Sequence, residues 1–209
     1  MNLCELMYTQ GNLEQAEAYL DEAEALARAK GHSMRMFAVL MHHSAIARKK
    51  DDNIQSESYL AEGIRLARQT GHPDHLMQLL TALGNQVCQR KDYDHARQYL
   101  QEALSIARQS EAPYKLCEVL HHWGELHFFQ GKWDEAEKIW TEVLKKSLAL
   151  DFPKHIIGAY HGLGRVAQVQ KNDELSRRHH QNWQSMYDQM DMHEKKWIKY
   201  WLPDLPVEM

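Results

Sequence analysis

The chain of 209 residues repeats itself every 40 positions, and this period limits the folds that are open to it. The pair Tyr19-Leu20 recurs as Tyr59-Leu60 and again as Tyr99-Leu100. Prolines and small residues return at the same step, at Pro73, Pro113 and Pro153 and at Cys4, Ser44, Gly84, Gly124 and Gly164. A fixed period of roughly 20–50 residues is typical of solenoids, in which each unit buries its apolar face only against its neighbours. Such a chain presents a surface, so we expect a binding or scaffolding module and not an enzyme.

Residues 73–112 show what one unit contains. Pro73 suits the first turn of a helix, because the N–H that it lacks would have no partner there. Apolar residues then recur at helical spacing, at Leu76, Leu79, Leu80, Leu83 and Val87. The segment Lys91–Asp94 breaks this pattern, and a second apolar stripe comes after it at Ala96, Tyr99, Leu100, Ala103, Leu104 and Ala107. Each unit is therefore predicted to be a helical hairpin.

These positions resemble the tetratricopeptide repeat in its form of about 40 residues. In the first helix a large apolar residue precedes a small one, as in Leu83-Gly84, Trp123-Gly124 and Leu163-Gly164. The second helix opens with related strings, GNLEQAE at 11–17 and GKWDEAE at 131–137. The resemblance implies an all-α fold, a right-handed α-solenoid of about five helical hairpins with a C-terminal capping helix.

The period divides the chain into a repeat array, residues 1–192, and a final segment, residues 193–209. The predicted repeats are 1–32, 33–72, 73–112, 113–152 and 153–192. In the final segment Trp197, Ile198, Trp201 and Leu202 lie at helical spacing, which predicts the capping helix, and Pro203 and Pro206 come after it.

The first repeat begins in the middle of its first helix, so we expect Leu3, Leu6 and Met7 to form an exposed apolar edge. The simpler interpretation is a segment of a larger protein, and the alternative is a homodimer that forms through this end.

Composition excludes several classes of partner. Lys and Arg number 25 against 29 Asp and Glu, and no basic block occurs, so nucleic acid is not expected to bind. The cysteines Cys4, Cys88 and Cys117 lack the paired spacing of a metal site and suit a reducing compartment. No apolar run is long enough for a membrane span and no signal peptide is evident, so we expect a cytoplasmic protein without membrane contact.

In the repeats that this chain resembles, the first helices line a concave groove. Corresponding positions place polar side chains along it, and Asn and Gln amides can each donate to and accept from a peptide backbone. Arg165 could bind a carboxylate with two hydrogen bonds, and Phe128 and Phe129, expected to be exposed, could dock an apolar anchor. The predicted groove residues are Gln78, Thr81, Asn85, Glu118, His121, Glu125, Phe128, His161, Arg165 and Gln168.

Histidine is frequent, with 14 residues that include the pairs His42-His43, His121-His122 and His179-His180. His121, Glu125 and His161 should converge on one face, which raises the question of a metal site. We expect no metal and no other cofactor, because no H-E-x-x-H motif is present and adjacent histidines on a helix point in different directions. No nucleophile motif or phosphate-binding glycine loop occurs, so catalysis is not expected.

The most direct interpretation is a protein- or peptide-binding module. The 40-residue form resembles the sensor regions of maltose-regulator-type activators and related signalling ATPases of bacteria, and is similar to repeats of polarity adaptors and kinesin light chains. That resemblance implies the sensor or interaction region of a larger regulatory protein. The alternatives are a free-standing adaptor, a small-molecule receptor that uses the polar groove, and a metal-dependent enzyme that uses the same residues.

Overall fold

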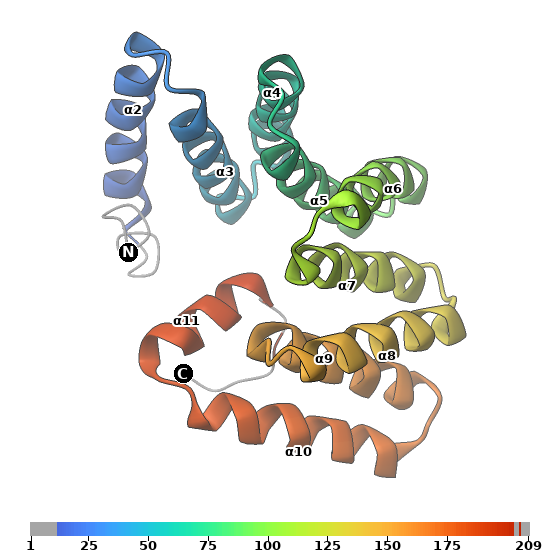
Figure 1. Ribbon diagram of the computed structural model, residues 1–209. Helices are drawn as coiled ribbons and strands as arrows, with labels where there is room; N and C mark the ends of the chain where they lie inside the picture. Colours follow the sequence, from blue (N-terminus) through green and yellow to red (C-terminus); the bar gives the residue numbers. More distant parts are fainter. Residues whose placement is uncertain (1–11, 203–204, 206–209) are drawn as a thin grey trace. The chain divides into compact units, whose positions relative to one another are not determined.

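The structure is a computed structural model that describes residues 12–202 and Leu205. Within these residues every regular element is a helix, and the helices are joined in sequence by short turns (Figure 1). They are α2 (Leu13–Ala29), α3 (Ser33–Lys49), α4 (Asn53–Thr70), α5 (Pro73–Gln89), α6 (Tyr93–Gln109), α7 (Pro113–Phe129), α8 (Trp133–Ala149), α9 (Pro153–Val169), α10 (Asp173–Gln189) and α11 (Met192–Trp201). The predicted all-α fold, with helices in tandem, is confirmed.

The period of the sequence sets where the helices begin. Helices α5, α7 and α9 each start on a proline, at Pro73, Pro113 and Pro153. Four of the second helices start after a side chain that caps them, because its oxygen accepts a hydrogen bond from a backbone N–H of the first turn. These caps are Asn12, Asp52, Asp92 and Asn172. The five-repeat division stays a prediction, since residues 1–11 lie outside the described part, and with them the edge predicted at Leu3, Leu6 and Met7.

The helix ends recur at a regular interval along the chain. Many of the turns between them contain a residue with positive φ, the conformation that commonly ends a helix. Within the described part these residues are Gly31, Asp51, Gly71, Lys91, Gly131, Asp151 and Lys171. The turn between α6 and α7 departs from the series, because Ser110 there is extended, with φ −79° and ψ 139°.

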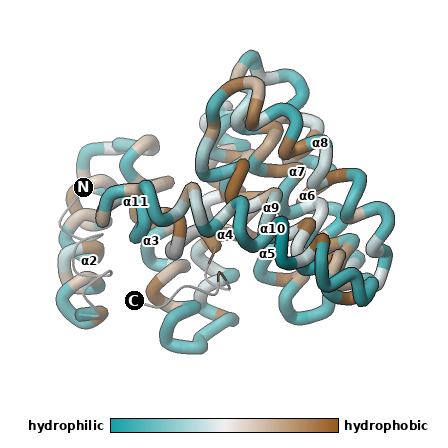
Figure 2. Tube along the Cα trace, turned by 90° about the horizontal axis from the view of Figure 1, so that it is seen from below, coloured by the Kyte–Doolittle hydropathy of each residue, from teal (hydrophilic) through white to brown (hydrophobic). Residues whose placement is uncertain are grey.

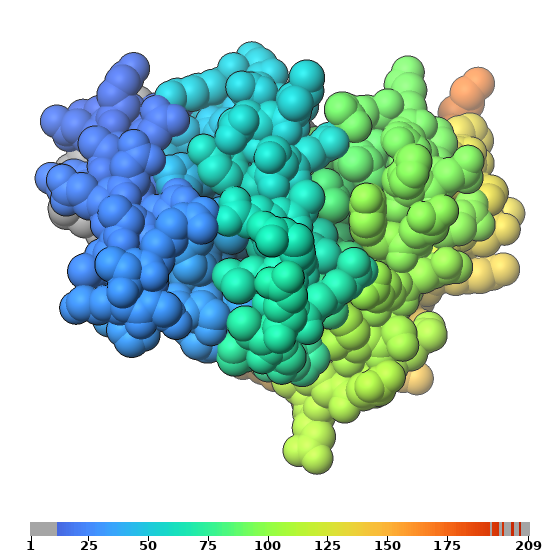
Figure 3. Space-filling model, turned by 90° about the horizontal axis from the view of Figure 1, so that it is seen from above, coloured from blue at the N-terminus to red at the C-terminus, as the bar shows by residue number. Residues whose placement is uncertain are grey.

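By contacts the chain divides into two compact units, residues 1–87 and 88–209, and each is described by itself. In unit 1 the helices pack in chain order, coloured blue to teal in Figure 3. Ala16 and Leu20 of α2 are buried against Ile46 of α3. Small residues on the second helices let the next first helix approach closely, as at Gly63, where a Cβ would lie 2.8 Å from Cδ2 of Leu79.

A buried polar contact joins three helices of unit 1. The hydroxyl of Ser56 on α4 donates to the backbone oxygen of Ser44 on α3 at 2.9 Å, and the two hydroxyls lie 2.8 Å apart. Nε2 of Gln86 on α5 donates to both hydroxyls, at 3.1 Å and 2.8 Å. Ser176 repeats part of this arrangement in unit 2, where its hydroxyl donates to the backbone oxygen of Gly164. These serines therefore pair small size with a specific hydrogen bond between helices.

Trp140 of α8 is one of two fully buried tryptophans in the core of unit 2, among the described residues. It is fully buried and packs with Ala136, Leu163 and Val166. Its ring faces two glycines, since a Cβ at Gly124 would lie 2.6 Å from Nε1 and a Cβ at Gly162 2.5 Å from Cε2. The indole Nε1 donates to the backbone oxygen of His121 at 3.2 Å, so this large residue is hydrogen-bonded as well as packed.

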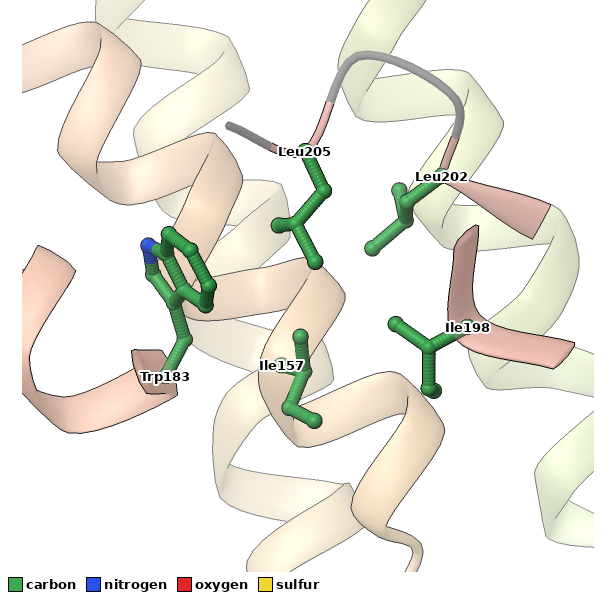
Figure 4. Packing of buried hydrophobic residues seen from close by; sticks show 5 residues of the cluster. All are labelled: Ile157, Trp183, Ile198, Leu202 and Leu205. Atoms are coloured by element: carbon green, nitrogen blue, oxygen red, sulfur yellow. The ribbon is translucent and has the colours of Figure 1, made fainter. Parts of the chain in front are cut away.

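The last helix folds back onto α9 and α10. Asp191 and Glu194 form a capping box at the start of α11, each side chain bonding the other's backbone. Ile198, Leu202 and Leu205 then pack against Ile157 and Trp183 (Figure 4). The predicted capping segment thus contains a helix that buries apolar side chains. The side chains of Trp197 and Trp201, and residues Pro203 and Pro206, lie outside the described part.

Hydrophobic and hydrophilic residues alternate along the helices, as amphipathic packing requires (Figure 2). Among the described residues, no helix is both long enough and apolar enough to cross a membrane.

Candidate functional site

The first helices α7 and α9 of unit 2 lie beside each other and carry most of the predicted site. Equivalent positions of the two repeats face one another, so Glu125 of α7 meets Arg165 of α9, with Nη1 donating to Oε1 at 3.0 Å. The guanidinium also lies over Phe128, 4.2 Å from the ring centroid, and 5.4 Å from that of Phe129. A cation over a ring face is attracted by the ring's negative face. Arg165 is therefore held in one orientation by a carboxylate and two aromatic rings.

The two phenylalanines differ in exposure. Phe129 is 37% exposed, as predicted. Phe128 is half-buried instead, because it lies beneath Arg165 and packs against Trp140, with ring centroids 5.9 Å apart. The expectation that both rings are open to a partner therefore holds for Phe129 alone.

One turn of α7 brings three potential metal ligands together. His121, His122 and Glu125 each offer a donor atom, and these atoms lie within 4.8 Å of one another. Nδ1 of His122 is 3.7 Å from Oε2 of Glu125. His121 is 1% exposed, and the Glu125 side chain is 12% exposed.

The sequence places His161 in this group, whereas the structure brings His122 there. His161 is buried on α9, and its ring lies edge-on to Trp183, with ring centroids 6.5 Å apart. His161 therefore contributes to packing against α10 as well as bordering the site.

Charges around Glu125 outweigh the effect of its burial. Burial works to raise the pKa of this carboxyl, but the neighbouring His122, His121 and Arg165 lower it to about 2. Burial lowers the pKa of His121 well below its usual value, and it lowers that of His161 to about 4 with the help of Arg165. At neutral pH the site therefore holds an ionised carboxylate, a guanidinium and the neutral imidazoles of His121 and His161.

A second ion pair joins the same two helices nearer their N-termini. Nζ of Lys154 on α9 lies 3.6 Å from Oε2 of Glu118 on α7. Burial lowers the pKa of Lys154, and Glu118 opposes that shift. The adjacent His155 is buried, and its pKa falls to about 4. Gln168, near the end of α9, is exposed. Polar groups thus extend along the length of the face that α7 and α9 share.

The other three predicted residues lie on α5 in unit 1. Gln78 is exposed. Thr81 is buried, and its hydroxyl donates to the backbone oxygen of Met77 at 2.7 Å within the same helix. Asn85 is half-buried, and its Oδ1 is buried without a hydrogen-bond partner among the described residues. Of the three, Gln78 has the side chain most exposed to a ligand.

Comparison with known proteins shows which repeats this chain is similar to. Residues 35–109 match the model of the tetratricopeptide repeat family. The fold is that of tetratricopeptide-type repeats. The crystal structure of BtubC (BKLC) from P. vanneervenii is similar, with a TM-score of 0.68 and 18% identity, over 94% of this chain and 85% of that one. A search of curated proteins found no match.

Repeats of a putative kinesin light chain from Podosopora anserina, described as nearly identical and TPR-like, are also similar. Their crystal structure gives a TM-score of 0.64 at 14% identity, over 88% of this chain and 91% of that one. A variant of the same repeats gives 0.63 at 14% identity, over 89% and 96%. At these identities the likeness establishes the fold alone. The predicted similarity to kinesin light chain repeats is confirmed at that level, and the resemblance to bacterial sensor regions stays a prediction.

Two features of these tetratricopeptide-type repeats are missed by sequence analysis. His122 is not among the predicted residues, because adjacent helical side chains diverge, yet both histidines precede Glu125 by one turn and so both reach it. Gly162 is also missed as the neighbour of Trp140. The sequence does contain a signal for it. Gly162 is a glycine at a repeat position where residues 42, 82 and 122 all have a side chain.

Proposed function

We propose that the chain is a protein- or peptide-binding module whose ligand lies along the first helices α7 and α9 of unit 2. Tetratricopeptide-type repeats generally mediate protein–protein interaction. The observation that carries the proposal is the set of contacts that Arg165 makes and the donors that it leaves unused. Its Nη1 bonds Glu125 and its plane rests on Phe128, while its other N–H groups make no hydrogen bond within the described residues. The side chain is 20% exposed, so these donors are available to a ligand.

Such an arrangement suits a carboxylate or a backbone carbonyl of an extended peptide. The guanidinium is oriented before the ligand arrives, which reduces the conformational entropy lost on binding. Glu118 and Gln168 lie on the same two helices, and exposed Phe129 adds apolar surface beside Arg165. We further propose that this module serves as the interaction region of a larger regulatory protein in the cytoplasm.

Native mass spectrometry of the purified chain, before and after mild denaturation, tests the proposal first. We expect a copurifying peptide, whose sequence then supplies a synthetic ligand for calorimetric titration. Arg165→Ala should weaken its binding by about tenfold, the effect of losing roughly 1.4 kcal/mol of hydrogen bonding. Arg165→Lys should recover only part of the affinity, because an ammonium lacks the planar fork of donors.

Lys138 provides the matched control. It lies on the second helix α8 and is exposed, so Lys138→Ala should leave the affinity unchanged. Undiminished binding in Arg165→Ala would refute the placement of the ligand on α7 and α9. A copurifying small molecule instead of a peptide would favour the receptor alternative.

A further inference from the structure

The three histidine pairs of the chain differ in the residue that lies one turn later on the same helix. That residue is Glu125 for His121-His122, Ile46 for His42-His43 and Trp183 for His179-His180. A residue on a helix contacts those three and four positions before it, so Glu125 lies next to both histidines of its pair. Of the three pairs, this one alone has a carboxylate one turn later on its own helix.

We propose that His121, His122 and Glu125 bind one divalent transition-metal ion of the zinc class, through one donor atom each. Their donor atoms already lie within 4.8 Å of one another. A tetrahedral ion with bonds of about 2.1 Å needs donors about 3.4 Å apart, so small side-chain rotations on a fixed helix turn are sufficient. Two imidazoles and one carboxylate suit zinc or cobalt, and leave a fourth position for water or a ligand atom. The expectation of no metal rested on the missing H-E-x-x-H motif and on diverging histidines, whereas here the donor atoms of both histidines lie near the same carboxylate.

The surroundings orient the carboxylate of Glu125. Arg165 bonds Oε1 of Glu125, and Oε2 lies on the side of His122. Arg165 thereby orients the carboxylate as an outer-shell residue does in metal sites, although its positive charge weakens the binding of a cation. We therefore expect reversible, moderate affinity and not a permanently bound structural ion.

The site goes beyond the proposed peptide binding and does not require it. His121 is almost wholly buried, while His122 and Glu125 retain 9% and 12% exposure, so an ion would enter from their side. An ion there would lie beside Arg165, the residue proposed to contact the peptide. A metal titration without peptide tests the site separately from the proposed function.

The test uses the full chain, stripped with EDTA, dialysed, and titrated with Zn²⁺ in a calorimeter and with Co²⁺ in a visible spectrophotometer. We expect one ion per chain and the intense visible bands of four-coordinate Co²⁺, which Zn²⁺ abolishes by displacement. His122→Ala and Glu125→Gln should each weaken Zn²⁺ binding at least about tenfold. The double variant His179→Ala/His180→Ala removes another pair and should bind as the unaltered chain does.

Circular dichroism identifies any variant that has lost its fold, and the Co²⁺ spectrum of the unaltered chain needs no variant. Absence of those bands, or octahedral bands alone, would overturn the proposal. Equal weakening in the His179→Ala/His180→Ala control would also overturn it, because binding would then be spread over surface histidines.

Discussion

Trp140 determines which residues can occupy positions 124 and 162. The equivalent position holds Leu20, Leu60 and Leu100 in the three preceding repeats, so the indole adds volume that the neighbouring helices have to accommodate. Gly162 meets that need, because a Cβ there would lie 2.6 Å from Cε3 of Trp140, well inside van der Waals contact. The pair is an example of size compensation between helices, in which neither residue is explained without the other.

Gly162→Ala should lower the free energy of unfolding by about 1–3 kcal/mol, because the added methyl overlaps a ring that has no room to move. Urea unfolding followed by circular dichroism measures this loss. In a Trp140→Leu background the same change should have a much smaller effect, since the shorter side chain vacates the space. An equal loss in both backgrounds would contradict the compensation.

At the scale of the helix, many helices end at a residue in the left-handed backbone conformation, and not all of these residues are glycine. Lys91 has φ +66° and Gly131 has φ +74°, at equivalent turns of successive repeats. A side chain in this conformation costs about 1–2 kcal/mol, and a glycine loses about 0.4–1 kcal/mol more entropy on folding. The residue chosen at each turn therefore changes stability without changing any contact.

Lys91→Gly should raise the free energy of unfolding by about 0.5–1 kcal/mol, the difference between the strain removed and the entropy added. Gly131→Ala should lower it by about 1 kcal/mol through backbone strain alone, because a Cβ at Gly131 meets no atom within 4 Å. Denaturant midpoints of the two variants test the prediction together. If both midpoints shifted in the same direction, the left-handed backbone conformation would not be the cause of the change in stability.

At the scale of the molecule, the stability of unit 2 should depend on pH through its buried histidines. Burial lowers the pKa of His155 to about 4, with Lys154 adding to the shift and Glu118 opposing it. His122 is the other titratable group that acts on it, and also lowers it. A histidine in the unfolded chain has a pKa of about 6.5, so as the pH falls it binds a proton before the buried His155 does. Protonation therefore stabilises the unfolded state relative to the folded one.

The free energy of unfolding should therefore fall as the pH drops from about 6.5 towards about 4. His155→Leu should reduce that fall, as measured by urea unfolding at pH values on both sides of the interval in the presence of EDTA. The exposed His32→Leu serves as control and leaves the buried histidines in place. An unchanged pH dependence in His155→Leu would exclude this residue as its source.

The helices and their starts can be predicted from the sequence because they depend on local chemistry. Prolines, capping residues and apolar spacing act within one turn, and the helices begin at Pro73, Pro113 and Pro153 as the repeat predicts. Side-chain environments are harder to predict, because they depend on neighbours on other helices, far away along the chain. The hydroxyl of Thr81 donates to a backbone oxygen of its own helix, and Phe128 lies beneath Arg165. Neither fact follows from aligning the repeats with one another.

The regularly spaced left-handed residues also limit how such a chain can change in length. One residue inserted within a helix turns everything after it by about 100° and moves the apolar stripe away from its neighbour. Duplication or deletion of one whole repeat preserves the order of proline, cap and left-handed turn at every later position. Growth and loss by whole hairpins are therefore the tolerated route, for evolution and for an engineer who wishes to lengthen the array.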